Sequence, residues 1–328
     1  MSFSRSFGIG LARKVRHFAQ RYGSGTRGKK IRTPILLYHA VDPQQDESPI
    51  PASHNISPQR LYQQLSFLRQ HFDVVALDDI FQRIRQGKAI EGLAAITFDD
   101  GYASALEYAV PILDDLNLPA TMFLITCTLQ SVMRWRDKVL LIITSNLVEQ
   151  FLDFARQLDS AFDPIQPGRF YQETKNPTIV ASPLVDRVAD EFFRVRGQFI
   201  QAPLARYSTI EQLTRVKYPN LSFGNHSHHH YVLSTMSKVE QAHDINKAER
   251  LLGELDVPLT QIFSIPFGGL RTFNQDTLDI LEDLHYTGYL LSSGYKPVDA
   301  CAGMDDIVYN NNLIALNRFM PADAPLFS

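Results

Sequence analysis

Short apolar runs alternate with amphipathic segments along most of this chain, and this alternation constrains the fold more than any other feature. Residues 34–39, 93–98 and 120–125 have the length and composition of buried strands, and residues 103–116 have helical periodicity. Strands and helices that alternate at this spacing predict βαβ units and therefore a parallel α/β sheet.

The same pattern returns in the second half of the chain. Strands are predicted at 221–224, 261–265, 286–291 and 313–316, and helices at 209–216, 238–255 and 274–284. The first half also contains a predicted strand at 72–77, predicted helices after Ser57 and at 80–84, and a predicted helix cap at Asp78. The resulting seven or eight strand–helix units favour a closed (β/α) barrel over an open doubly wound sheet.

The alternation stops between about residues 127 and 207. Helical patterns at 134–158 and 184–200 flank a stretch that is interrupted by proline and glycine. Structureless loops of this length are rare inside compact domains, so we expect a mainly helical insertion in a domain that covers residues 33–328. The insertion is either a cap on the substrate side of the barrel or a packing accessory remote from the site.

Residues 1–32 form a basic leader with nine Lys and Arg residues and no acidic one. Apolar residues recur in it at helical spacing, which indicates either peripheral contact with an anionic membrane surface or a loosely structured basic tail. The leader has no continuous apolar core of a signal peptide, and no run is long enough to span a bilayer. A cytoplasmic protein, with or without peripheral membrane contact, is therefore expected.

Charge and cysteine content exclude several classes of function. The net charge of −3 argues against a general nucleic-acid binder, which needs a basic surplus. The two cysteines, Cys127 and Cys301, are too few and too far apart for a disulfide framework or a cysteine zinc site. Any bound metal is therefore expected to have histidine and carboxylate ligands.

Asp99 and Asp100 follow the predicted strand 93–98 directly. Ligands bind at the carboxyl ends of strands in α/β folds, so this pair is a candidate site. Adjacent carboxylates raise each other's pKa unless a cation such as a metal ion lies beside them. Taken alone, Asp-Asp-Gly is also an ordinary turn sequence.

Four histidines lie within residues 226–230, just after another predicted strand. His226 and His230 are four residues apart, so on a helical turn they would share one face and could bind one metal ion. A carboxylate from Asp99 or Asp100 would complete a His-His-carboxylate site with open positions for water. The alternative is an exposed histidine-rich loop.

Residues 97–101 (Thr-Phe-Asp-Asp-Gly) and 226–230 (His-Ser-x-x-His) resemble the first two motifs of the polysaccharide deacetylase family, also called carbohydrate esterase family 4 or the nodulation-protein-B homology domain. The resemblance covers most of the chain from residue 33 onward, except the insertion. It implies a distorted (β/α) barrel of about seven strands. It also implies an amide hydrolase with a divalent metal, usually zinc, in which Asp99 is the base and Asp100, His226 and His230 bind the metal.

The third family motif, Arg-x-Pro-Tyr/Phe-Gly, is matched only in part. Pro266, Phe267 and Gly268 agree with it and are candidate substrate or oxyanion residues, but Ser264 stands where the motif has arginine. The late Leu-x-His motif, the family's source of the general acid, is replaced by Leu-Asn-Arg at residues 316–318. Arg318 is therefore a candidate substitute for the missing arginine near Asp99.

His39 is the candidate general acid. Residues 38–41 (Tyr-His-Ala-Val) resemble the first strand end of relatives with a rearranged strand order, which use this histidine as the acid. The alternative is a structural histidine that forms hydrogen bonds at the barrel mouth. A backbone N–H near Tyr102 is the expected donor to the oxyanion.

The predicted reaction is removal of an N-acetyl group from a saccharide by water activated at the metal, with Asp99 as base. The saccharide is either a polysaccharide or a lipid-linked or nucleotide-linked precursor. Aromatic residues that could stack on sugar rings or simply pack are Phe98, Tyr102, Trp135, Tyr231 and Phe267. Two other functions remain open: a non-catalytic saccharide-binding barrel that retains the metal site, and a metal hydrolase of a non-sugar amide.

Overall fold

The computed structural model describes residues 33–44, 50, 54–197, 206–292, 301–302, 308–310 and 312–321. The basic leader, residues 1–32, lies outside this range, so its contact with a membrane stays a prediction. Within the described residues, no helix combines the length and apolar character needed to cross a bilayer.

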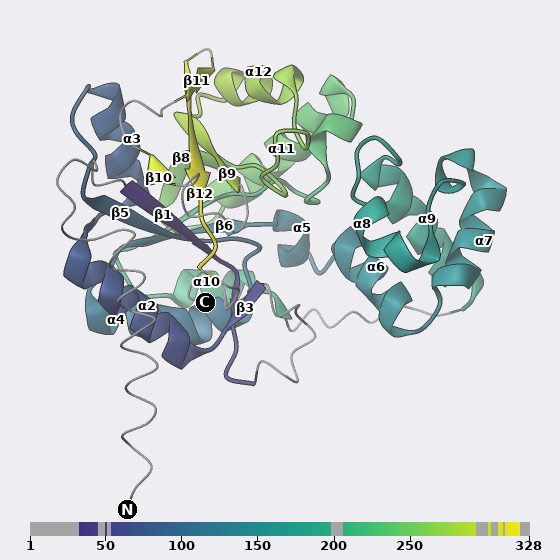
Figure 1. Ribbon diagram of the computed structural model, residues 1–328, viewed down its shortest axis with the longest axis horizontal. Helices are drawn as coiled ribbons and strands as arrows, with labels where there is room; N and C mark the ends of the chain where they lie inside the picture. The colour runs from purple at the N-terminus through teal and green to yellow at the C-terminus, as the bar shows by residue number, and fades with distance from the viewer. Residues whose placement is uncertain are drawn as a thin grey trace, which may run out of the picture.

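Seven parallel strands form a nearly closed barrel (Figure 1). In order around the barrel they are β1 (Thr33–Tyr38), β5 (Leu93–Phe98), β6 (Ala120–Leu124), β7 (Leu221–Asn225), β8 (Leu259–Ser264), β9 (Gly288–Ser292) and β12 (Leu313–Arg318). The ring closes between β12 and β1, where the Leu37 N–H donates to the Phe319 carbonyl (2.8 Å) and the Phe319 N–H donates to the Ile35 carbonyl (3.0 Å). The predicted distorted barrel of about seven strands is confirmed.

Short strands flank the barrel. They are β2 (Ala40–Val41) paired with β3 (Asn55–Ile56), β4 (Asp73–Val74) beside β5, β10 (Cys301–Ala302) antiparallel to β1, and β11 (Val308–Asn310) antiparallel to β12. The strand predicted at 72–77 is present only as β4, because helix α3 (Leu77–Arg85) begins at the end of that run. The cap predicted at Asp78 is wrong: Ala76 precedes the helix, and the Asp78 carboxylate accepts a hydrogen bond from Thr260 Oγ1 (2.8 Å).

The inside of the barrel changes from apolar to polar along its axis. Strand residues such as Ala95 and Leu316 pack with the apolar face of α3 at the amino end of the strands. Side chains two residues apart on a strand lie on the same face. Thr97 therefore follows Ala95, and Arg318 follows Leu316, on the inner face. This alternation places polar groups at the carboxyl ends of the strands.

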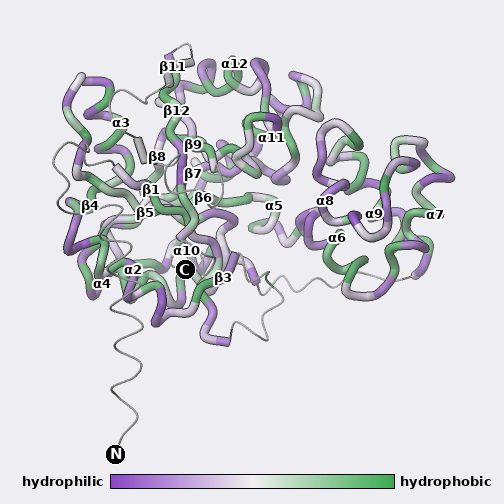
Figure 2. The backbone as a smooth tube through the Cα atoms, viewed as in Figure 1, coloured by the Kyte–Doolittle hydropathy of each residue, from purple (hydrophilic) through white to green (hydrophobic). Residues whose placement is uncertain are grey.

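Amphipathic helices cover the outer face of the barrel, as the alternation of green and purple in Figure 2 shows. They are α2 (Pro58–His71), α4 (Val110–Leu116), α5 (Thr126–Leu129), α10 (Ile210–Arg215), α11 (Lys238–Gly253) and α12 (Gln275–Asp283). Ser237 and Glu240 form the predicted capping box of α11. The helix predicted at 103–116 begins with a π-helical turn, Ala105–Ala109, before α4.

Helices from the segment between β6 and β7 lie to one side of the barrel (Figure 1). They are α6 (Trp135–Thr144), α7 (Val148–Leu158), α8 (Phe170–Glu173) and α9 (Ser182–Val195). They have their own apolar core, in which the rings of Phe162, Phe170 and Phe192 all meet Phe151 edge to face. We call these helices and their connecting loops, residues 130–197, the helical insertion.

Candidate metal and catalytic site

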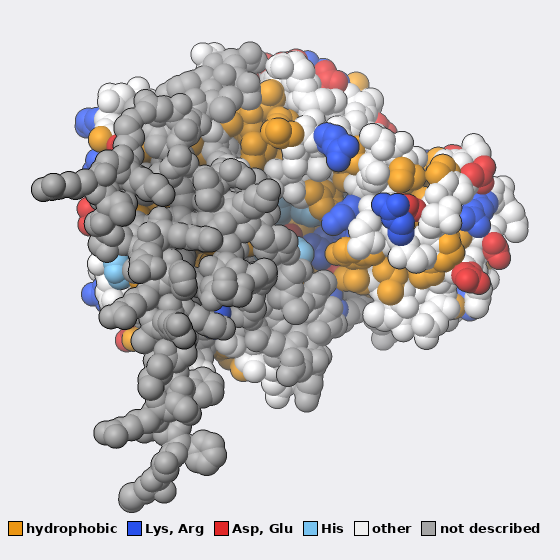
Figure 3. All heavy atoms as spheres, in the orientation of Figure 1, with side chains coloured by type: hydrophobic (Ala, Val, Ile, Leu, Met, Phe, Trp, Pro, Cys, Tyr) orange, Lys and Arg blue, Asp and Glu red, His pale blue; other side chains and the backbone are white. Residues whose placement is uncertain are grey.

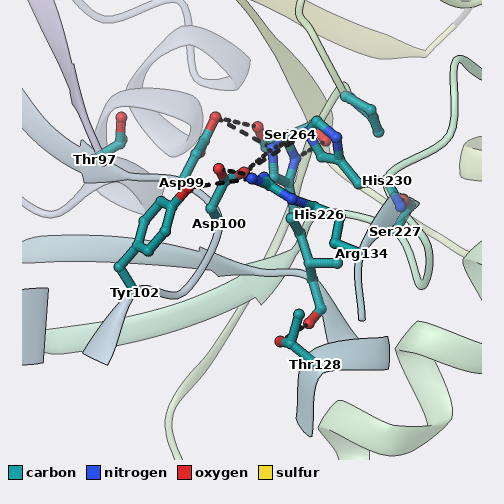
Figure 4. A network of polar contacts seen from close by, with 12 residues as sticks. Thr97, Asp99, Asp100, Tyr102, Thr128, Arg134, His226, Ser227, His230 and Ser264 are labelled. Carbon is teal, nitrogen blue, oxygen red and sulfur yellow. Dashed lines mark hydrogen bonds and ion pairs between the residues drawn. The ribbon is translucent and has the colours of Figure 1, made fainter. Parts of the chain in front are cut away.

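Asp99 and Asp100 lie at the carboxyl end of β5, where a sharp turn begins. Asp99 still belongs to the barrel, because its N–H donates to the Tyr38 carbonyl (2.9 Å). Asp100 and Gly101 both have left-handed backbone angles, with φ of 73° and 75°. This conformation is uncommon for residues with a side chain and is found at functional sites. The turn brings both carboxylates into the barrel mouth (Figure 4).

Asp99 is bound by Arg318 from the last barrel strand. The two terminal nitrogens of Arg318 each lie 2.7 Å from one oxygen of Asp99, a bidentate arrangement. The Ser264 hydroxyl donates to Asp99 (3.1 Å) and accepts from Arg318 (2.8 Å). The structure thus places a guanidinium from residue 318 at Asp99, as proposed for the arginine missing at 264. Burial tends to raise the pKa of Asp99, but Arg318 and then His226 outweigh it and lower this pKa.

Asp100 is bound by Arg134, which precedes α6 in the helical insertion. Arg134 Nη1 lies 2.6 Å from Asp100 Oδ2, and both residues are buried. Burial tends to raise the pKa of Asp100, but Arg134 and then His230 hold this pKa well below its usual range. Because Arg134 takes Oδ2, the other oxygen, Oδ1, is left facing the two histidines. At this point the insertion is part of the site, so the interpretation of it as a remote packing accessory is wrong.

His226 and His230 converge on the same point beside Asp100. Their Nε2 atoms are 3.2 Å apart, and each lies 3.7 Å from Asp100 Oδ1. The predicted helical turn is wrong: residues 226–230 form an irregular turn in which Ser227 and His230 have φ of 64° and 58°. The exposed-loop alternative is wrong too, since both imidazoles are buried.

This group of three side chains fits a divalent metal. Zn–N and Zn–O bonds of about 2.0–2.2 Å put neighbouring ligand atoms about 3–3.6 Å apart, close to the separations found here. His226 Nδ1 donates to the Ser264 carbonyl (2.8 Å), which leaves the lone pair of Nε2 directed at the site. Asp100, His226 and His230 are the candidate ligands that the structure brings together.

The remaining histidines of the cluster have structural partners. His228 Nδ1 lies 2.8 Å from Thr126 Oγ1, and His229 Nδ1 lies 2.6 Å from a carboxylate oxygen of Asp244. They therefore tie the turn to α5 and α11 and do not face the metal ligands.

His39 lies at the same pocket, between β1 and β2. The pocket has a volume of about 380 Å³ and is lined by Asp99, Asp100, His226 and His230 as well as His39. The imidazole of His39 is partly buried and meets the ring of His54 edge to face, with centroids 4.6 Å apart. Burial and then His54 lower the pKa of His39 to about 3. The structure places His39 in the same pocket as Asp99 and Asp100, and its role as acid stays a prediction.

The third motif contributes unequally to the pocket. Phe267 and Gly268 line it, whereas Pro266 is buried and does not. The Phe267 ring packs against His230, with centroids 4.6 Å apart. Gly268 has a φ of 60°, and a Cβ there would lie 2.4 Å from the Ser292 nitrogen, so a larger residue does not fit.

Most of the candidate stacking residues pack elsewhere. Phe98 is buried in the outer core against Tyr38 because it lies on the outer face of β5. Trp135 and Tyr231 are absent from the pocket lining, and the indole N–H of Trp135 donates to the His230 carbonyl (2.8 Å). Tyr102 does line the pocket, where its hydroxyl accepts from Arg134 Nη2 (3.2 Å).

Several residues that line the pocket are not predicted from the sequence as site residues. They are His54, Arg134, Arg136, Tyr171 and Lys175. All but His54 belong to the helical insertion, whose helices have no characteristic spacing relative to the barrel motifs. An Arg-Trp-Arg sequence at residues 134–136 was the available signal, but nothing in it indicates that Arg134 reaches Asp100.

Comparisons with known proteins agree with this site. The sequence matches the polysaccharide deacetylase family over residues 86–148 and 188–289, half of the chain; the gap between them lies in the helical insertion. No curated protein matches it in sequence.

Several solved structures, two of them described as deacetylases, have a similar fold. The deacetylase PplD of Streptococcus pyogenes, solved in complex with acetate, has a TM-score of 0.54 and 17% identity, with 90% of this chain and 95% of that one covered. A de-N-acetylase from Aggregatibacter actinomycetemcomitans has a TM-score of 0.53 and 15% identity, covering 89% and 96%. IcaB from Ammonifex degensii has a TM-score of 0.54 and 16% identity, with 90% of this chain and 94% of that one covered. With the family match and the Asp-His-His site, they lead to one conclusion: the chain belongs to the polysaccharide deacetylase family.

Proposed function

We propose that this protein is a metal-dependent hydrolase that removes N-acetyl groups from a saccharide. The observation that carries the proposal is the pairing of two unlike carboxylates. Asp100 faces His226 and His230 as a metal ligand, whereas Asp99 is tied to Arg318 beside them. A ligand group with a separate carboxylate next to it is the arrangement that hydrolysis by an activated water requires.

Zinc is the metal we propose for the Asp100, His226 and His230 group. When bound, it would polarise the acetyl carbonyl and lower the pKa of a water molecule from 15.7 to about 7–9. The nitrogen-rich donor set suits zinc, although other divalent ions accept it as well.

Asp99 is the proposed base. Its pKa is lowered by Arg318, so the carboxylate is ionised at neutral pH and ready to accept a proton from the attacking water. Arg318 and Ser264 fix its orientation through three hydrogen bonds. The backbone N–H of Tyr102, at the turn after Asp100, is the proposed donor to the negative oxygen of the tetrahedral intermediate.

His39 is the proposed acid for the leaving amine. Because its pKa is about 3, the imidazole is neutral before substrate binds. It therefore has to take up a proton, from Asp99 or from solvent, as negative charge builds up on the substrate, and then pass it to the nitrogen as the C–N bond breaks. Asp99, which already holds the proton from water, is the competing donor. A His39→Ala variant that releases acetate at the wild-type rate would assign the donor role to Asp99.

The substrate is proposed to be an N-acetylated polysaccharide or a lipid-linked or nucleotide-linked precursor. Membership of the family supports a saccharide, and the related PplD was solved with acetate, the product expected here. A non-catalytic binding barrel would bind metal and saccharide without releasing acetate. An amide hydrolase of another kind would release acid from small amides and leave N-acetyl sugars intact.

The deciding experiment follows acetate release from N-acetylated sugars, with metal content measured in the same samples. We expect Asp99→Asn to lose about 10²–10⁴-fold in rate, the range for a general base, while it keeps its metal. His226→Ala should lose both the metal and the activity. His243→Ala, at an exposed position on α11, is the matched control and should keep both. Wild-type rates in Asp99→Asn and His226→Ala together would refute the mechanism.

A further inference from the structure

The pocket beside Asp99 and Asp100 contains an excess of positive charge. Its cationic lining residues are Arg134, Arg136, Lys175 and Arg318. Asp99 and Asp100 are the carboxylates among the described lining residues, and each is already bound by one arginine. Two cations, Arg136 and Lys175, therefore remain without a negative partner in the described lining.

Arg136 is held rigidly by neutral groups. Its terminal nitrogens donate to Thr174 Oγ1 (3.0 Å) and to the Tyr171 carbonyl (2.9 Å). Its guanidinium carbon lies 4.0 Å from the centroid of the Tyr171 ring and 4.8 Å from that of Trp135. Only 3% of the residue is exposed, and no described carboxylate forms an ion pair with it. Burying a charge without a counter-charge is costly, which marks the position as one that a ligand could complete.

Lys175 lies just beyond α8 on the same wall of the pocket. Its Nζ is 5.3 Å from the Tyr171 ring, and it forms no ion pair within the described chain. Burial and then the neighbouring Arg136 lower the pKa of Lys175, so the two cations repel each other. Unlike Arg136, Lys175 is partly exposed and can reach a ligand in the pocket.

The nearest carboxylate in sequence does not neutralise this pair. Asp137 accepts from Arg134 (3.2 Å), from Arg206 (3.4 Å) and from the Tyr207 hydroxyl (2.6 Å). Another lysine of the insertion, Lys138, is by contrast fully paired, with Asp186 and Asp190 each at 2.6 Å. Acidic partners are therefore present in the insertion, but they are directed away from the pocket.

The positive side chains are located where the insertion meets the barrel. Figure 3 shows Lys and Arg side chains gathered at this junction, next to a histidine. The barrel supplies the proposed reacting groups, and the insertion supplies both unpaired cations. A ligand in the pocket would thus meet the metal ligands on one side and positive charge on the other.

We propose that Arg136 and Lys175 form a subsite for an anionic group, phosphate or carboxylate, carried by the N-acetylated saccharide. The inference rests on the function proposed above and narrows its substrate class. Arg136 supplies a fixed positive potential, and the Lys175 ammonium donates hydrogen bonds to the anion. The pocket of about 380 Å³ falls in the range of small-ligand sites, so the anion lies close to the acetamido group.

The test compares three sugars that share the acetamido group: neutral N-acetylglucosamine, N-acetylglucosamine 1-phosphate and N-acetylmuramic acid, which carries a carboxylate. Binding is measured by calorimetry on the full chain in the presence of chelator, where no turnover occurs. We expect at least one anionic sugar to bind about tenfold or more tightly than the neutral one, a difference that weakens at high salt. Whether the phosphate or the carboxylate binds better identifies the source of the anion.

Two variants test the residues. Arg136→Gln and Lys175→Gln should each reduce the preference for the anionic sugar by about tenfold. Lys175→Gln is the decisive variant, because Lys175 is partly exposed and its loss does not empty a buried position. The control is Arg187→Gln, at an exposed position on α9 outside this pocket, which should keep the full preference.

The outcomes separate the subsite from the proposed reaction. Equal binding of all three sugars, or an unchanged preference in Lys175→Gln, would overturn the subsite. A Lys175-dependent preference without acetate release in the metal-loaded protein would support the subsite and refute the deacetylase function. Acetate release from the neutral and anionic sugars with equal kcat/KM would refute the subsite alone.

Discussion

Asp99 and Asp100 are neighbours in the sequence, yet their carboxylates are held by arginines from two different regions of the molecule. Arg318 comes from the last barrel strand, and its side chain is fully buried where it lines the pocket. Arg134 comes from the helical insertion and borders the pocket. The proposed base is thus bound to the strand that closes the barrel, whereas the candidate metal ligand is bound to the helical insertion, which also lines the pocket. The difference shows that the site depends on the insertion as well as on the barrel.

Removing Arg318 should have the largest effect. Arg318→Met leaves the Asp99 carboxylate buried without its partner, which typically costs about 3–5 kcal/mol of the free energy of unfolding. Urea denaturation measures this loss, and acetate release should fall with it. The double variant Arg318→Met with Asp99→Asn removes both charges and should be more stable than the single variant. An Arg318→Met variant as stable as the wild type would contradict the proposed dependence of Asp99 on Arg318.

A swap of positions sharpens the same point. The family motif has its arginine at the place of Ser264, whose hydroxyl already contacts both Asp99 and Arg318. Arg318→Ser with Ser264→Arg should therefore recover part of the activity that Arg318→Ser alone loses. No recovery would show that the guanidinium works only from β12.

Removing Arg134 should have a smaller effect, and we expect it mainly on the affinity for zinc. Arg134→Met frees Asp100 Oδ2, so the orientation of the ligand oxygen is lost and zinc affinity should drop about 10–100-fold. Loss of a positive charge acts in the opposite direction, but we expect orientation to dominate because the contact is as short as 2.6 Å. Zinc titration calorimetry measures the change, with the exposed Arg187→Gln on α9 as control. Tighter zinc binding in Arg134→Met would contradict this account.

Stability of the metal-free protein should depend on both carboxylates in acid. The folded-state pKa values of Asp99 and Asp100 lie below the ordinary value of 3.8. Their stabilisation is therefore present above pH 3.8 and is lost as the pH falls toward the lower folded values. Each unit of pKa depression corresponds to about 1.4 kcal/mol. Urea denaturation in chelator between about pH 5 and 2.5 measures how the free energy of unfolding changes with pH. This dependence should be shallower for Asp99→Asn than for the wild type. Equal pH dependence in the two proteins would argue against a lowered pKa of Asp99.

The smallest expected effect is at Trp135, which also links the insertion to the site. Trp135→Phe removes the indole N–H that donates to the His230 carbonyl, a loss of about 1 kcal/mol. Zinc affinity should change severalfold at most. A loss as large as that in Arg134→Met would mean that the insertion positions His230 as strongly as it positions Asp100.

Much of the barrel and of the site could be predicted from the sequence, because both depend on local pattern. Apolar runs give strand positions, and polar residues directly after them, such as Asp99 and His226, fall at one end of a parallel barrel. Predictions failed where the local pattern was ambiguous. The left-handed turn at Ser227 and His230 was predicted to be helical, since both conformations permit a spacing of four residues between ligands.

The sequence by itself determined the barrel, the candidate metal ligands and the neighbouring carboxylate, since strand periodicity and motif order are encoded over short stretches. Only the tertiary structure decided how the two carboxylates differ. Arg318 reaches Asp99 because closing the barrel sets the last strand beside the first, and Arg134 reaches Asp100 because the insertion folds back onto the strand ends. Contacts between residues so far apart in sequence leave no local periodicity, and the charges that tune the site become visible only when the chain is folded.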